Sequence, residues 1–324
     1  MKIIEKLFNK ALILSTGLCV EIDSSFSLKW NNQPWGAGGL IPAGPPWNMV
    51  GPYDFDGDGF GDFIVSSSYA GSFCNGVYHY EAAMNDSIEL KWVYTFYDLS
   101  CDYDAYSSVA VGDIDGDGNQ EVLSLVDTSP GVLGQEGLQI FEWDQDSLSF
   151  LSSPTYTWDM GLDSVWEAAQ IHVEDIDNDL KEEIIVSIMD GPWTEFGLGG
   201  SSRLMIFELD TIVNDSAIFN IEYEDTVWTN WSGYNISVGD LDNDSNKEIY
   251  SVGYEFFHLI VHEATGQDMY QYQTDFFVAS EQAQRANQGI IIIDIDNDGL
   301  NEMFCATSGV NSLTGELINP GSIF

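Results

Sequence analysis

The stretch that decides the fold is Asp113-Ile-Asp115-Gly-Asp117-Gly-Asn-Gln-Glu121, nine residues with acids at positions 1, 3, 5 and 9. Four more copies begin at Asp54, Asp175, Asp240 and Asp294 and carry acids at the same positions. Carboxylates this close together repel one another by roughly 1 kcal/mol per pair even in a water-like dielectric. Each copy is therefore expected to bind a cation, and hard oxygen ligands in this number indicate calcium.

These loops differ from EF-hand loops, which open in the same way but close with a bidentate Glu at position 12 between two helices. Position 12 is Val65, Ser124, Val186, Ser251 or Cys305, none of which is a strong calcium ligand. The flanking runs are rich in β-branched residues and lack a helical period. We therefore expect every loop to join two buried strands.

The spacing of the loops predicts a repeat architecture. The opening Asp residues are 59, 62, 65 and 54 residues apart, and each period holds the same series of apolar runs. After the loop and its exit strand comes a third run, such as 76–81 or 203–208, and a polar turn such as 84–87 or 144–147 then leads into a fourth. Four antiparallel strands per period predict an all-β fold of the β-propeller type, with one blade per period.

The repeats resemble the FG-GAP or VCBS type, which is found in the integrin alpha-subunit propeller and in many secreted bacterial proteins. The family's calcium motif, Asp-x-Asp-x-Asp-Gly-x-x-Asp, is matched closely by residues 54–62. The resemblance extends over about residues 25 to 324. It departs from the family at position 6, where Leu180 and Ser245 replace the usual Gly. Because a positive φ costs a non-Gly residue on the order of 1 kcal/mol, and because Lys181 adds a positive charge beside the ion, we expect the third loop to bind calcium most weakly.

The resemblance implies that the four acids of each loop ligate one calcium ion together with a backbone carbonyl at position 7, which gives about five ions in all. The implied side-chain ligands are Asp54, Asp56, Asp58, Asp62, Asp113, Asp115, Asp117, Glu121, Asp175, Asp177, Asp179, Glu183, Asp240, Asp242, Asp244, Glu248, Asp294, Asp296, Asp298 and Glu302.

Residues 1–24 have the layout of a signal peptide, with three Lys residues up to Lys10 followed by a mostly apolar run over 11–20. That run is too short to span a bilayer. An amphipathic first helix is the alternative interpretation. We therefore expect residues 25–324 to form a secreted or cell-surface propeller domain without membrane insertion.

The composition also limits the partners. The formal net charge of −44 excludes nucleic acid and anionic membrane surfaces as electrostatic partners. The loops hold 20 of the 53 acids, so five calcium ions would leave the surface strongly acidic. No catalytic motif is present, and no catalytic residue is assigned.

The two ends of the chain bear on ring closure. Residues 25–30 are similar to the fourth run at 87–92, and residues 321–324 are similar to the start of a third run. We expect residues 25–30 to be the outermost strand of the blade that begins at Ile290, and this blade to be incomplete. A five-bladed ring and, preferably, a seven-bladed ring that continues past Phe324 both fit these runs.

Three functions remain open. The first is an exported binding or adhesion module for an extracellular glycan or a surface protein, and the second is a polysaccharide-degrading enzyme on a propeller scaffold. The third is a subunit of a surface layer or fibre that self-assembles through the incomplete last blade. Aromatic residues ahead of the loops are candidate sugar platforms, with packing between blades as the alternative. They are Trp47, Tyr106, Trp166, Trp228, Trp231 and Tyr234.

Overall fold

A computed structural model describes residues 46–67, 76–84, 87–96, 107–126, 137–160, 166–190, 201–213, 216–227, 235–252, 258–277 and 288–306. All regular structure in these ranges is β. None of it forms a helix long and apolar enough to cross a membrane.

The strands form four four-stranded antiparallel sheets and two strand pairs. We call the four sheets and the last strand pair blades 1 to 5 in chain order. Blade 1 contains β1 (Pro46–Tyr53), β2 (Asp62–Ser67), β3 (Gly76–Met84) and β4 (Ser87–Thr95), and blade 2 contains β5 (Ser107–Gly112), β6 (Glu121–Val126), β7 (Gly137–Phe141) and β10 (Tyr156–Trp158). Blade 3 contains β11 (Trp166–Glu174), β12 (Glu183–Asp190), β13 (Ser201–Val213) and β14 (Ser216–Val227). Blade 4 contains β15 (Asn235–Gly239), β16 (Glu248–Val252), β17 (His258–Gly266) and β18 (Met269–Phe277), and blade 5 contains β19 (Gln288–Ile293) and β20 (Glu302–Ala306).

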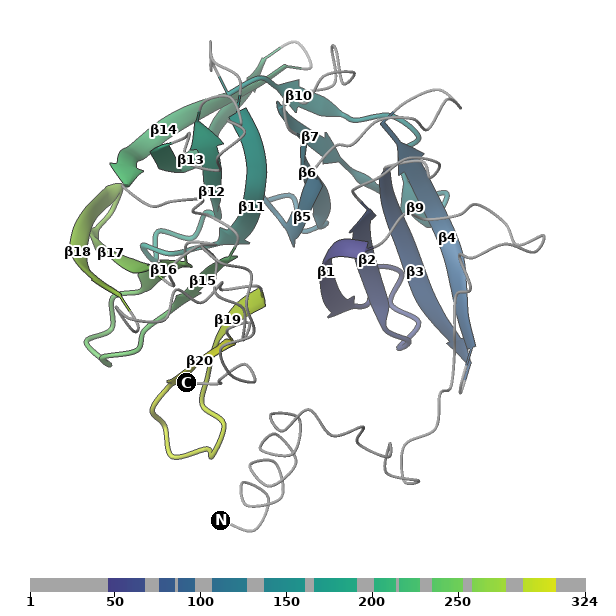
Figure 1. Cartoon of the computed structure of the whole chain (residues 1–324). Coiled ribbons are helices and arrows are strands. Elements are labelled where there is room, and N and C mark those ends of the chain that lie inside the picture. Colours follow the sequence, from purple (N-terminus) through teal and green to yellow (C-terminus); the bar gives the residue numbers. More distant parts are fainter. Residues whose placement is uncertain are drawn as a thin grey trace, which may run out of the picture.

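The blades are arranged as in a β-propeller. Their first strands are neighbours in space, because β1 contacts β5, β5 contacts β11, β11 contacts β15, and β15 contacts β19. Figure 1 shows the sheets following one another around an arc in chain order. The predicted all-β propeller class is therefore confirmed.

The hydrophobic core lies between blades. Along β12, Ile184, Val186 and Ile188 pack towards blade 2, whereas Ile185 packs towards blade 4. Successive strand residues point to opposite faces, so a blade with neighbours on both sides needs apolar residues at consecutive positions. Burying one such side chain stabilises the fold by about 1.5–3 kcal/mol. The need for buried apolar side chains on both faces of a blade explains the continuous apolar runs in the sequence.

The prediction for the fourth strand of blade 2 was wrong in its position. The turn at 144–147 does not lead into that strand but closes a separate hairpin, β8 (Trp143–Asp144) with β9 (Ser149–Phe150). The fourth strand is β10, which pairs with β7. Trp143 stacks on Phe55 of blade 1 and Phe150 contacts the same ring edge to face, so aromatic packing holds the additional hairpin against the neighbouring blade.

Candidate metal centres

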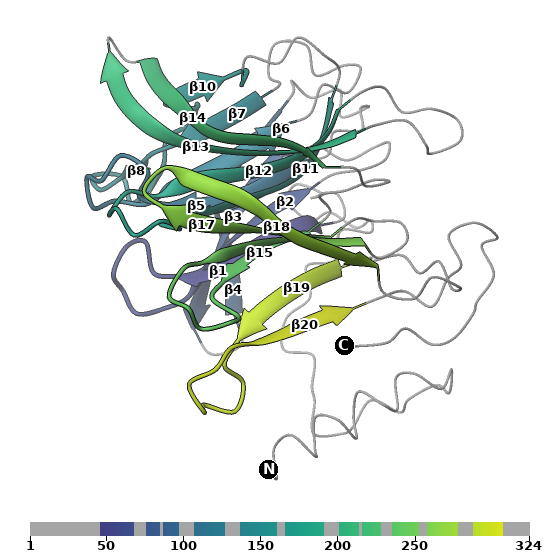
Figure 2. The same cartoon turned by 90° about the vertical axis from the view of Figure 1, so that its left-hand side faces the viewer.

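Each acidic loop connects the first and second strands of its blade, as predicted. Figure 2 shows the loop between β1 and β2 and the loop between β19 and β20 on the same side of the molecule. The repeat thus presents one loop per blade to one face of the propeller.

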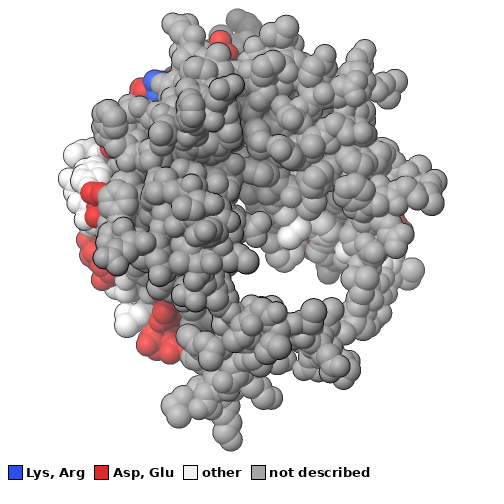
Figure 3. All heavy atoms as spheres, viewed as in Figure 1, with Lys and Arg blue, Asp and Glu red and all other residues white. Residues whose placement is uncertain are grey.

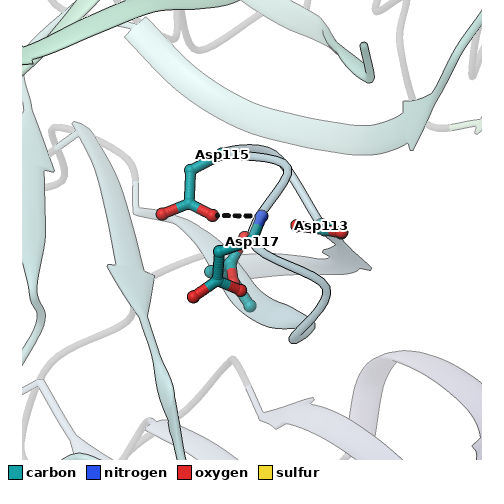
Figure 4. A group of neighbouring side chains, drawn as sticks. Asp113, Asp115 and Asp117 are labelled. Atoms are coloured by element: carbon teal, nitrogen blue, oxygen red, sulfur yellow. Dashed lines mark hydrogen bonds between the residues drawn. The ribbon is translucent and has the colours of Figure 1, made fainter. Parts of the chain in front are cut away.

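The five loops share one hydrogen-bond pattern. The position 6 amide donates to the carboxylate at position 1, over distances from 2.9 to 3.2 Å. The position 7 amide donates to the carboxylate at position 5, over 2.7 to 2.9 Å. Figure 4 shows a further bond in the second loop, from the Asp117 amide to the Asp115 carboxylate at 3.1 Å. These bonds curl the chain so that its carboxylates converge.

This turn of the chain requires two residues with a left-handed backbone conformation in every loop. Position 4 is Gly or Asn, with φ between 59° and 74°, and position 6 has φ between 79° and 91°. Leu180 adopts φ 79° and Ser245 φ 80° at position 6, although both carry a Cβ atom. The strain expected at position 6 from the sequence is therefore present, and the need for Gly or Asn at position 4 is an additional finding.

The acid at position 9 is buried in the first four loops, whereas Glu302 of the fifth loop is half-buried. The position 9 carboxylate accepts a hydrogen bond from the position 2 amide in all five loops, over 2.6 to 3.0 Å. In Glu121, Glu183 and Glu248 the second oxygen, Oε1, has no hydrogen-bond partner among the described residues, although each side chain is at most 1% exposed. A buried carboxylate oxygen without a donor is costly unless it binds a cation.

The carboxylates in the second, third and fourth loops also meet a distance criterion for a shared ion. In each loop, one oxygen atom from each of the four acids lies within 4.8 Å of the others. Calcium takes six to eight oxygen ligands at 2.3–2.6 Å, so oxygens with this separation can share one ion. The residues present therefore fit a calcium ion in these three loops.

Burial and mutual repulsion disfavour the ionised form of these groups. Burial, with a smaller contribution from neighbouring carboxylates, raises the pKa of Glu121 to about 9 and that of Glu183 to about 8. The pKa of Glu248 is also raised, again mainly by burial. A divalent cation would reverse this preference, because an opposite charge nearby favours the carboxylate.

The first loop differs from the others at position 9, where Asp62 replaces Glu. The Oδ1 atom of Asp62 lies 2.8 Å from Nε2 of His79, and both side chains are 1% exposed. The cluster of converging oxygens in this loop contains only Asp54, Asp56 and Asp58. One of its four predicted ligands is thus already engaged by a histidine.

Sequence reasoning missed a link from loop to loop through position 8. Glu182 of the third loop accepts a hydrogen bond from the Asp113 amide of the second loop at 2.6 Å. Lys247 of the fourth loop donates to the Asp175 carbonyl at 2.8 Å, and Asn301 of the fifth loop donates to the Asp240 carbonyl at 2.8 Å. In the third, fourth and fifth loops the position 8 side chain therefore contacts position 1 of the preceding loop and connects adjacent candidate metal centres.

A second missed feature is a Glu on the third strand, opposite position 9. Asp62 pairs with Glu81, and Glu248 pairs with Glu263. Lys91 neutralises Glu81 at 3.0 Å, and Lys181 pairs with the equivalent residue of blade 3, Glu208. These glutamates end each third run in the sequence, but their position beside the metal centres depends on the strand register.

Several sequence predictions lie outside the described residues. These include residues 1–24 and 25–30, residues 321–324, and the aromatic residues Tyr106, Trp228, Trp231 and Tyr234. Trp47 and Trp166 lie in β1 and β11, but their side chains are not described. The number of blades and the sugar platforms therefore remain predictions, as does the carbonyl ligand that the resemblance implies at position 7.

A pocket of about 280 Å³ lies between the second and third loops. Residues 113–116 and 180–181 line one part of it, and residues 209–212 at the end of β13 line another. Leu180 is 91% exposed and Ile212 is 38% exposed, so the pocket combines carboxylates with accessible apolar surface.

Comparison with known protein families supports the repeat that the sequence predicts. Residues 23–124 match the family model of the FG-GAP-like repeat. This stretch is similar in sequence to FG-GAP-like repeats. The resemblance seen in the acidic loops is therefore confirmed for blade 1 and the start of blade 2. The FG-GAP-like pattern of blade 1, an acidic loop between the first and second strands, recurs in the sheets that follow.

Among solved structures, the chain is similar to the crystal structure of the exotype rhamnogalacturonan lyase YesX, with 14% sequence identity and a TM-score of 0.35. The similarity covers 74% of this chain and 53% of the lyase chain, so it spans about half of that protein. The chain matches none of the curated proteins with which it was compared.

Proposed function

We propose that this protein is an exported, calcium-stabilised β-propeller that binds an extracellular glycan or a surface protein. The unpartnered, buried Oε1 atoms of Glu121, Glu183 and Glu248 are the observation that carries the calcium part of the proposal. Three separate loops leave the same atom without a donor, and each atom belongs to a carboxylate cluster.

The donor set favours calcium over softer metals. All candidate ligands are oxygens, and calcium prefers carboxylates and carbonyls in flexible sets of six to eight. When bound, calcium supplies positive charge between carboxylates that otherwise repel one another. The chain holds these groups in place through the position 2 and position 6 amides, and its left-handed residues at positions 4 and 6 keep the loop closed.

The binding part of the proposal rests on the pocket between the second and third loops. Asp115, Asp210 and Thr211 offer hydrogen-bond acceptors and a hydroxyl beside the exposed Leu180 and Ile212. Convergent polar groups with apolar patches suit a hydroxyl-rich ligand such as a sugar. The acidic surface along the left-hand edge in Figure 3 argues for a neutral or basic partner.

Glycan binding is tested by applying the whole protein to a polysaccharide panel in calcium and then in excess chelator. We expect retention on at least one neutral glycan without turnover, and weaker retention by Asp210→Ala. Glu89→Gln, an exposed change on β4, is the matched control and should bind as wild type does. Depolymerisation of a polysaccharide would favour the enzyme instead, and binding to no glycan or surface protein would contradict the proposal.

Export is proposed from residues 1–24, which have the signal-peptide layout. Production in a bacterial host with the native leader should give periplasmic or extracellular protein that lacks this segment. N-terminal sequencing of the product tests this directly. A cytoplasmic product that begins at Met1 would contradict it.

A further inference from the structure

The position 8 side chains of the third and fourth loops lie between candidate ligands of two adjacent metal centres. Position 8 directly precedes position 9, where the buried Oε1 atoms of Glu183 and Glu248 have no hydrogen-bond partner among the described residues. At its other end, each link contacts the backbone of position 1 in the preceding loop, which is also a candidate ligand. Each link therefore joins two metal centres through residues of, or next to, their ligand sets.

The link between the second and third loops is short and closely surrounded. The Asp113 amide donates to Oε2 of Glu182 at 2.6 Å. A Cβ atom at Gly112, the residue before position 1, would overlap both this oxygen and Val173. An opening of the second loop that moves its position 1 must therefore break this bond or displace Glu182.

The link between the third and fourth loops is a small network. Nζ of Lys247 donates to the Asp175 carbonyl at 2.8 Å and to Oε1 of Glu174 at 2.6 Å. Nε2 of His172 lies 3.1 Å from the other carboxylate oxygen of Glu174. The third loop is thus linked on both sides, to the second loop through Glu182 and to the fourth loop through Lys247.

The first loop has no equivalent link to the second among the residues that the structure describes. Position 8 of the second loop is Gln120, which is exposed and makes no hydrogen bond to position 1 of the first loop. The first and second loops are therefore not connected through position 8.

We propose that the second, third and fourth loops bind calcium cooperatively, because Glu182 and Lys247 transmit the closed state of one loop to the next. This inference rests on the proposed calcium loops and concerns the order in which they fill. Without calcium, the repelling carboxylates favour an open loop, in which position 1 moves and the link breaks. When position 1 is fixed, the linked side chain is fixed with it, and so is the chain at position 9 of the neighbouring loop. A loop that is already ordered binds its ion more tightly, and thermodynamic linkage makes the effect mutual.

A calcium titration of the whole protein against a competing chelator tests the role of Glu182. Wild type should bind with a Hill coefficient above unity. Glu182→Ala removes the link, whereas Glu182→Gln loses the same charge but keeps an oxygen that accepts the Asp113 bond. We expect the Hill coefficient to fall in the Ala variant and to stay near the wild-type value in the Gln variant. Elemental analysis should find the same number of ions in both variants.

Removing one ion at a time tests the coupling between loops. Asp242→Asn combined with Asp244→Asn disables the fourth loop, and the remaining ions should then bind at least about fivefold more weakly. Asp56→Asn combined with Asp58→Asn disables the first loop and loses the same formal charge. This matched control should leave the affinity of the remaining ions unchanged, because the first loop has no such link to the second.

Two results would overturn the coupling while the calcium loops stand. One is the same Hill coefficient for the Ala and Gln variants of Glu182, and the other is an equal effect of disabling the first and the fourth loop. A wild-type protein that binds no calcium would overturn the proposed calcium loops together with their coupling.

Discussion

At the residue scale, Leu180 is the position where the sequence conflicts most with the local backbone. It adopts φ 79° and is 91% exposed, so its side chain gains little from packing. The structure bears out the strain but also places Asp268 and Gln267 against this loop, which supports it from blade 4. The expectation that the third loop is weakest therefore stays a prediction.

We predict that Leu180→Gly tightens calcium binding at the third loop. When the bound loop imposes a strain of about 1 kcal/mol that the free loop can relax, removing that strain corresponds to about a fivefold gain in affinity. Leu180→Ala is the control, because it removes the side chain but keeps the Cβ atom, and it should bind as wild type does. Titration against a competing chelator measures the change. Equal affinities for the Gly and Ala variants would exclude backbone strain as the cause.

The buried glutamates predict a pH dependence for the metal-free protein. The folded-state pKa values of Glu121 and Glu183, about 9 and about 8, lie above the ordinary carboxyl value of 4.5. The folded state therefore holds protons that the unfolded chain releases, and stability falls as the pH rises from about 4.5 towards 9. Calcium should reverse the trend, because it binds the ionised form.

Melting temperatures of chelator-treated and calcium-loaded protein between pH 5 and pH 9 measure this dependence. We expect the difference between the two forms to grow with pH. A constant difference across this range would mean that these glutamates do not titrate at the metal centres.

At the scale of the strand, the sequence predicted the first three strands of every complete blade, because apolar runs and acidic loops mark them directly. The β8–β9 hairpin was missed because nothing local distinguishes its turn from an ordinary blade turn. The hairpin forms because of tertiary contacts: Trp143 and Phe150 pack on blade 1, and the indole N–H of Trp92 donates to the Leu151 carbonyl at 3.1 Å. The links through position 8 were missed for the same reason, since they join different blades.

Close approach of the inner strands depends on Gly112 at the end of β5. A Cβ atom at this position would overlap Val173 of β11 and the carboxylate of Glu182. We predict that Gly112→Ala destabilises the protein by about 1–3 kcal/mol, the usual range for overpacking. Gly61→Ala is the control, because its Cβ atom would meet only Pro52, at 3.4 Å.

Urea unfolding in saturating calcium compares the two glycine variants with wild type. We expect a clearly lower midpoint for Gly112→Ala and a midpoint near that of wild type for Gly61→Ala. Indistinguishable midpoints for the two variants would show that the inner strands have room that the structure does not contain.

At the scale of the whole molecule, the sequence predicted the propeller because its repeats are long and regular and each contains one acidic loop at the same place. The four acids converge in the second, third and fourth loops, whereas in the first loop Asp62 contacts His79 instead. That exchange depends on a buried contact between β2 and β3, which no local pattern reveals. Closure of the ring by residues 25–30, and a five- or seven-bladed count, involve residues that lie outside the described ranges.

The central claim is that calcium holds the propeller together. Without the ion, the second, third and fourth loops each leave four repelling carboxylates between two strands of a blade, and the second to fifth loops are linked through position 8. An ion that binds only the folded state stabilises it by about 2.7 kcal/mol per site at a hundredfold excess over Kd. Several sites together should therefore raise the melting temperature substantially.

The most direct test is the melting temperature of the whole protein in calcium and in EGTA, with magnesium added back to the chelated sample as a control. The account predicts a large fall in EGTA, which calcium restores and magnesium does not. A melting temperature that is the same in calcium and in EGTA would contradict it.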